Sequence, residues 1–150
     1  SAISLLLRPR VPYSPAIPEI ANFVNNGAAS ITPAVAEKVL RQLPQWKLEF
    51  TQINAPLFPH LVDQLGFLAD VIEDALEGAY KELPYSALAQ GVFALVYAHK
   101  KVGIIPDSVL SLGYADNSSV VRAVLIQNEK AFAIYASAQG RNWQKITSQP

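Results

Sequence analysis

Apolar residues spaced four and three positions apart in the middle of the chain constrain the fold most strongly. This spacing keeps one face of a helix apolar, and it predicts a long helix that begins near Pro56 or Pro59. The only segment that alternates like a strand covers residues 46–50, and no second run of comparable quality could pair with it. The apolar stripe consists of Leu57, Leu61, Leu65, Leu68, Ile72, Leu76 and Tyr80.

A second helix is expected ahead of this stripe. Thr32 is a suitable N-cap and Pro33 a suitable first helical residue, and Pro44 is expected to end the helix. The strand-like run after Pro44 is interpreted as an extended connector that covers the helical core. Its apolar residues are Trp46, Leu48 and Phe50.

Two more helices complete the expected fold. Residues 85–101 are apolar on nearly every side, as in the central helix of a bundle. Asp116 is the expected N-cap of a last helix, and Gly140 is suited to follow its C-terminus. The predicted fold class is all-α, a small bundle of four to five helices.

Prolines near the N-terminus recur at every third residue, the period of a polyproline II helix. They predict an extended Pro-rich arm over residues 1–29, followed by a single helical domain over residues 30–150. Such an arm has no internal hydrogen bonds, so it must lie across the body, dock on a partner or move freely. Packing on its own domain is the simpler interpretation, and a ligand for an aromatic groove is the alternative. The interaction residues of the arm would be Pro9, Pro12, Tyr13, Pro15 and Pro18.

Composition argues against several classes of function. Twelve basic and twelve acidic residues cancel, which argues against a nucleic-acid partner, and without cysteine there is no disulfide, thiol catalyst or thiolate metal site. Residues are 51% hydrophobic and only 16% charged, so either the core is large or part of the apolar surface is covered by another molecule. No apolar run is long enough for a conventional transmembrane helix, and the N-terminus lacks a secretory signal. The expected location is cytoplasmic, with peripheral membrane contact as an alternative.

Four carboxylates gather on one face of the long helix. Solvated surface is the simplest interpretation of this acidic face, and a docking face for a basic partner or a divalent-cation site are alternatives. Like charges at this spacing repel, so a complementary basic surface, on this chain or another, would stabilise them. The acidic face consists of Asp70, Glu73, Asp74 and Glu77.

Catalytic and cofactor motifs are not found. His60 and His99 have no glutamate three residues before them, as metal-binding bundles require, and are interpreted as structural. Phosphate-binding glycine loops, a serine elbow and a metalloprotease motif are also missing. We therefore expect neither an enzyme nor a cofactor, and we interpret Trp46 and Trp143 as core residues.

The most specific pattern lies within residues 83–121, where a proline, an aspartate and a glycine predict a tight corner between two helices. This segment resembles the YkvA-like (DUF1232) family, whose members carry a similar pattern after an apolar helix. Gly103, Ser111 and Asn117 depart from that pattern. The matching residues are Ile105, Pro106, Asp107, Leu112, Gly113, Tyr114 and Asp116.

The resemblance implies a short helical domain of a kind often thought to be membrane-associated, and it implies no activity. We expect a non-enzymatic accessory or adaptor protein that acts by protein–protein contact in a larger complex, with the partner and the oligomeric state open. One alternative is a small metal-binding protein or enzyme that uses Asp107 and Asp116, with His99 nearby. The other is a membrane-inserted hairpin of residues 85–98 and 120–135.

Overall fold

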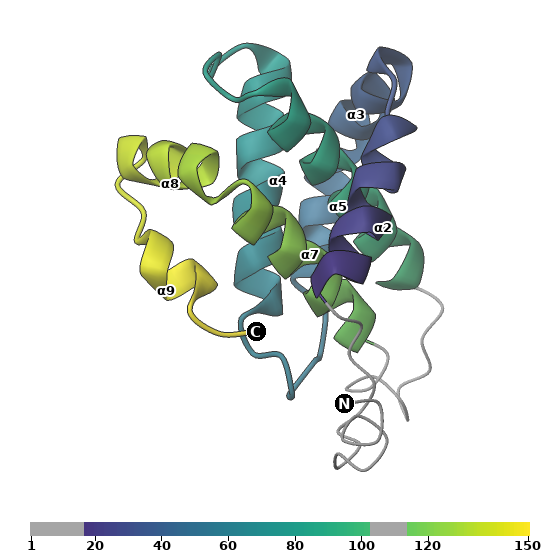
Figure 1. The fold of residues 1–150 in the computed structure, drawn as a ribbon, viewed down its shortest axis with the longest axis vertical. Coiled ribbons are helices and arrows are strands. Elements are labelled where there is room, and N and C mark those ends of the chain that lie inside the picture. Colours follow the sequence, from purple (N-terminus) through teal and green to yellow (C-terminus); the bar gives the residue numbers. More distant parts are fainter. Residues whose placement is uncertain (1–16, 103–113) are drawn as a thin grey trace.

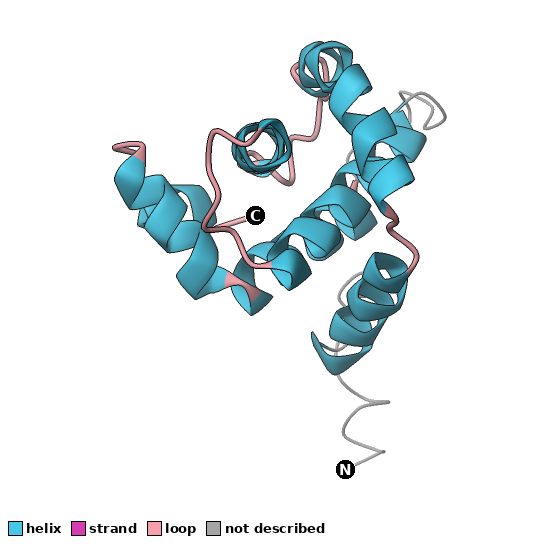
Figure 2. Cartoon of the chain, turned by 90° about the horizontal axis from the view of Figure 1, so that it is seen from above, coloured by secondary structure: helices cyan, strands magenta, loops and turns pink. Residues whose placement is uncertain are grey.

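The computed structural model describes residues 17–102 and 114–150, and every regular element in them is a helix (Figures 1 and 2). The all-α class is therefore confirmed. These two ranges hold seven helices, more than the four to five expected. The helices are α2 (Ile17–Ala29), α3 (Pro33–Phe50), α4 (Leu61–Glu77), α5 (Tyr85–Val102), α7 (Ala115–Gln127), α8 (Glu129–Ala138) and α9 (Trp143–Thr147).

Helix α2 occupies part of the segment expected to be an extended arm. Residues 17–29 are helical, and Val24 is fully buried against the core, so the arm prediction is wrong for this part. Pro18 lies in the first turn of α2, where a proline costs the helix no hydrogen bond. The other arm residues, Pro9, Pro12, Tyr13 and Pro15, lie outside the described residues.

Helix α3 begins as expected and ends later than expected. The hydroxyl of Thr32 accepts a 3.2 Å hydrogen bond from the Val35 amide, which confirms the N-cap. Pro44 does not end the helix, and the predicted extended connector is instead its last turn and a half. The proline costs about 3 kcal/mol, but continuing the helix buries Trp46 and Phe50, each worth about 2–3 kcal/mol.

The long helix α4 buries its predicted stripe, but it is shorter than expected. Leu57 and Tyr80 lie outside it, because the helix starts at Leu61 and Gly78 ends it with a left-handed φ of +84°. Helix α5 packs directly against α4 at Gly91, where a Cβ atom would lie only 2.5 Å from the Ile72 side chain. The stripe residues that are completely buried in α4 are Leu61, Leu65, Leu68 and Ile72.

The expected last helix is two helices, α7 and α8, that meet at Asn128. The Asn128 side-chain amide donates a 2.7 Å hydrogen bond to the Gln90 side chain and a 2.8 Å bond to the Val124 carbonyl. The side chain therefore competes with the backbone amide of Asn128 for the Val124 carbonyl. Asp116 is not the N-cap, because it lies in the first turn of α7 and Tyr114 occupies the capping position. Gly140 follows α8 with a φ of +68°, as the sequence predicted.

Helix α4 lies at the centre of the view in Figure 1, with α8 and α9 on one side and α2 and α3 on the other. The last residues of the sequence, 146–150, lie against the start of α4. There the buried Gln64 side chain donates hydrogen bonds to the Ile146 and Gln149 carbonyls, and the His60 amide donates one to Pro150. Within residues 17–102 and 114–150, no helix combines the length and apolarity needed to cross a membrane.

Candidate functional site

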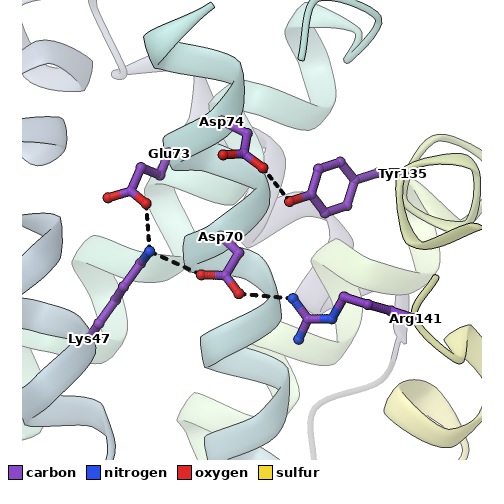
Figure 3. Close-up of polar contacts among 6 residues, drawn as sticks. All are labelled: Lys47, Asp70, Glu73, Asp74, Tyr135 and Arg141. Carbon is purple, nitrogen blue, oxygen red and sulfur yellow. Dashed lines mark hydrogen bonds and ion pairs between the residues drawn. The ribbon is translucent and has the colours of Figure 1, made fainter. Parts of the chain in front are cut away.

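The acidic face of α4 is paired with cations of this same chain (Figure 3). The Lys47 ammonium of α3 lies 3.0 Å from Asp70 and 2.6 Å from Glu73. The Arg141 guanidinium, from the loop between α8 and α9, lies 2.8 Å from the other Asp70 oxygen. The interpretation as solvated surface is therefore wrong for these two carboxylates. Arg141 and Lys47 supply the complementary basic surface from this chain.

A third carboxylate of the face binds a phenol. The Tyr135 hydroxyl on α8 donates a 2.6 Å hydrogen bond to Asp74. The rings of Tyr80 and Tyr135 pack edge to face, with their centroids 5.0 Å apart. Burial raises the pKa of Tyr135, and the hydrogen bond to Asp74 and the negative charges of Asp74 and Asp70 raise it further. Glu77, the fourth residue of the face, is exposed.

This cluster forms a clamp between helices, and electrostatics keep its lysine and its phenol protonated. Burial lowers the pKa of Lys47, but its hydrogen bonds to Glu73 and Asp70 and their charges outweigh that effect, so the net shift is upward and the ammonium stays charged. Tyr135 is likewise held protonated. Lys47 and Tyr135 therefore both keep their protons near neutral pH. The cluster joins α4 to α3, to α8 and to the loop before α9.

Beside the clamp lies an open groove of about 550 Å³. Its charged walls include Lys47, Asp70 and Arg141, which already pair with one another. Asp63 and Lys145 add one charge of each sign. The groove therefore has little unpaired charge to attract an ionic ligand.

Metal ligands are not gathered anywhere in the part of the chain that the structure describes, where no group of three or more suitable side chains exists. Asp107, one half of the predicted metal pair, lies outside that part. Asp116 is exposed in the first turn of α7 and already interacts with other groups. Among residues 17–102 and 114–150, no ligand set therefore gathers around Asp116.

The His99 side chain contacts two residues of α3, whereas His60 bonds only through its backbone among the described contacts. The His99 ring stacks on Trp46 with their centroids 4.1 Å apart, and its Nε2 lies 3.1 Å from a Glu49 oxygen. His60 precedes α4 without capping it through its side chain. Trp46 is 6% exposed and Trp143 packs on the core, as the sequence predicted.

Most of the predicted corner lies outside the described residues, including Ile105, Pro106 and Gly113. Its last part is visible at the start of α7, where Tyr114 is buried. The polar side chains of Asn117 and Ser118 are also buried, and neither forms a hydrogen bond with any of the described residues. Sequence analysis did not single out Ser118, because a serine inside a helical segment carries no recognisable pattern.

An apolar groove of about 410 Å³ opens between α3 and α5, with Leu76 of α4 at its edge. Tyr85 stands at its rim, 68% exposed, and its hydroxyl donates a 3.3 Å hydrogen bond to the Ile31 carbonyl. The sequence showed α5 to be apolar all round but not which side stays open. The lining residues are Ile31, Thr32, Pro33, Ala36, Glu37, Leu40, Leu76, Tyr85, Leu88 and Ala89.

Comparisons with protein-family models, curated proteins and solved structures find no match for this chain. The resemblance to the YkvA-like family therefore stays a prediction. The arguments below rest on the geometry of the described residues alone.

Proposed function

We propose that this chain is a non-enzymatic helical accessory protein that acts by protein–protein contact through the groove between α3 and α5. The observation that carries the proposal is the exposed Tyr85 at the rim of an apolar groove. Tyrosine is among the residues that most often dominate binding energy at protein interfaces, because it combines a large apolar ring with a hydrogen-bonding end.

The walls of the groove suit an apolar segment of a partner. Ala36 and Ala89 leave room at its base, while Leu40 and Leu88 line its sides. Among the described residues that line it, Glu37 is the only charged one. Its side chain is exposed and lies 3.5 Å from Arg41 on the same helix. A partner segment with two or three apolar side chains and one basic residue facing Glu37 would match this surface.

The experiment begins with affinity purification of the intact chain from its native cells in mild detergent. The recovered partner is then produced separately and titrated against the chain by calorimetry. Tyr85→Ala is expected to weaken binding about tenfold or more, and Glu37→Lys to weaken a basic partner further. Ile134→Ala is the matched control, because Ile134 is an apolar residue on α8 that is 55% exposed and lies outside the groove.

Equal affinity for the wild type, Tyr85→Ala and Ile134→Ala would contradict the proposal. Circular dichroism of each variant checks that helicity is unchanged.

Contact through the Pro-rich segment is a separate proposal. Removing residues 1–16 keeps all of α2, whereas a cut at residue 20 would destroy the first turn of that helix. If the segment binds the partner, this deletion lowers the recovery of the partner while Tyr85 is intact. Flotation of the chain with anionic liposomes tests the membrane-associated form of the proposal.

A further inference from the structure

A third cavity, of about 380 Å³, lies where α2 and α7 meet the last residue, Pro150. Helices α2 and α7 lie side by side in Figure 1 and are in contact. Ile20, Phe58 and Ile126 give the cavity apolar walls, and Ser118 and Arg122 give it polar ones. This combination of apolar walls and a few polar groups is typical of sites for small molecules, and the volume is at the small end of the usual range of about 300–1,000 Å³.

The hydroxyl of Ser118 is the unusual feature of this cavity. Ser118 is 1% exposed, and within residues 17–102 and 114–150 its hydroxyl has no hydrogen-bond partner. A serine inside a helix commonly bonds back to the carbonyl four residues earlier. Here the Tyr114 carbonyl accepts the Ser118 amide at 2.9 Å, and the Ser118 hydroxyl bonds to none of the described residues. A buried hydroxyl left without a partner destabilises the protein. The hydroxyl has less than 1 Å² of accessible surface, so a ligand in the cavity supplies the missing hydrogen bond only once the Ser118 side chain turns toward it.

Arg122 lies one turn further along α7. Its Nη1 donates a 2.9 Å hydrogen bond to the Thr147 carbonyl, which holds the half-buried guanidinium at the cavity wall. Within the described residues Thr147 is its one recorded hydrogen-bond partner, so further N–H groups can bind a ligand. The planar guanidinium matches the two oxygens of a carboxylate.

We infer that this cavity binds a medium-length alkyl carboxylate. The carboxylate pairs with Arg122 and accepts a hydrogen bond from Ser118, and the alkyl chain lies between Ile20, Phe58 and Ile126. This placement also accounts for Ile126, which is 54% exposed at the cavity although it is large and apolar. The inference does not depend on the contact groove, which is lined by other residues.

Calorimetric titration of the full chain with decanoate, below its micellar concentration, tests the inference. Saturable binding is expected, with decanol bound about tenfold more weakly because it lacks the charge for Arg122. Arg122→Gln is expected to lower decanoate affinity about tenfold or more while leaving decanol unchanged. Arg41→Gln, on the exposed face of α3, is the matched control.

Two further variants separate binding from folding. Ser118→Ala is expected to weaken decanoate severalfold and to raise the melting temperature of the ligand-free protein, since it removes an unpartnered hydroxyl. A serine with a purely structural role would show neither effect. Ile126→Glu changes an exposed position, so it leaves the fold intact and repels the carboxylate.

The inference is overturned if decanoate gives no saturable heat, or if it binds no better than decanol. It is also overturned if Arg122→Gln and Arg41→Gln bind decanoate equally well. Those outcomes would leave the Tyr85 experiment unaffected, so the two proposals fail separately.

Discussion

The hydroxyl of Tyr135 on α8 donates a 2.6 Å hydrogen bond to the carboxylate of Asp74 on α4, across 61 positions of sequence. Lys47 and Arg141 bind other carboxylates of the same acidic face. Through these contacts the face joins α4 to α3, to α8 and to the loop between α8 and α9 (Figure 3). The acidic face therefore contributes to the stability of the fold.

The first prediction concerns alkaline pH. The pKa of Tyr135 is raised above 10.0 and that of Lys47 above 10.5, so the folded chain holds both protons more tightly than the unfolded chain does. The stability that this difference provides is complete below pH 10 and is lost as the pH rises beyond it. We expect the melting temperature to fall steeply above pH 10, with the tyrosinate absorbance of Tyr135 appearing only as the protein unfolds.

Tyr135→Phe tests the origin of that loss. The variant is expected to be less stable by about 1–2 kcal/mol at neutral pH and to lose stability less steeply above pH 10. Tyr85→Phe, which changes an exposed phenol, serves as control. A wild type and a Tyr135→Phe variant with parallel pH profiles would contradict the assignment.

The second prediction concerns the Lys47 bridge. Lys47→Met keeps most of the apolar stem but leaves Asp70 and Glu73 without their shared cation, so we expect a loss of about 1–3 kcal/mol in urea unfolding. Arg41→Met removes an exposed ion pair with Glu37 within one helix and is expected to cost about 0.5 kcal/mol or less. Similar losses in the two variants would show that the bridge is no stronger than a surface pair.

The third prediction compares two glycines of the same region. Gly66 lies inside α4, and a Cβ atom there would meet nothing within 4 Å, so Gly66→Ala is expected to stabilise the protein by about 0.5–1 kcal/mol. Gly78 ends the helix with a φ of +84°, so Gly78→Ala is expected to destabilise it by about 1 kcal/mol. Thermal melts that shift in the same direction would refute the comparison.

The fourth prediction concerns the end of the chain. Gln64 is completely buried, and its side-chain amide donates to the Ile146 and Gln149 carbonyls. Gln64→Leu removes both hydrogen bonds, so residues 143–150 should exchange their amide hydrogens faster while the middle of α4 stays protected. Gln52→Leu, an exposed glutamine in the α3–α4 loop, provides the control. Unchanged exchange at the C-terminus would mean that other contacts hold it.

Local pattern was enough for much of the helical framework. The four-and-three spacing determined the buried face of α4, and Thr32 with Pro33 determined the start of α3, because these signals act between residues a few positions apart. The same kind of reasoning failed at Pro44, where a local stop signal is outweighed by the burial of Trp46 and Phe50. It also missed the break at Asn128, whose side chain bonds to Gln90 on another helix.

The candidate sites depended on distances in space that no local pattern records. By itself, the sequence determined that four carboxylates share a helical face and that the chain folds as helices. Only the tertiary structure decided that Lys47 and Arg141 neutralise that face, that Tyr85 borders an open groove, and that the Ser118 hydroxyl lacks a partner. Helical periodicity comes from neighbouring residues, whereas charge pairing and open space come from how separate helices pack.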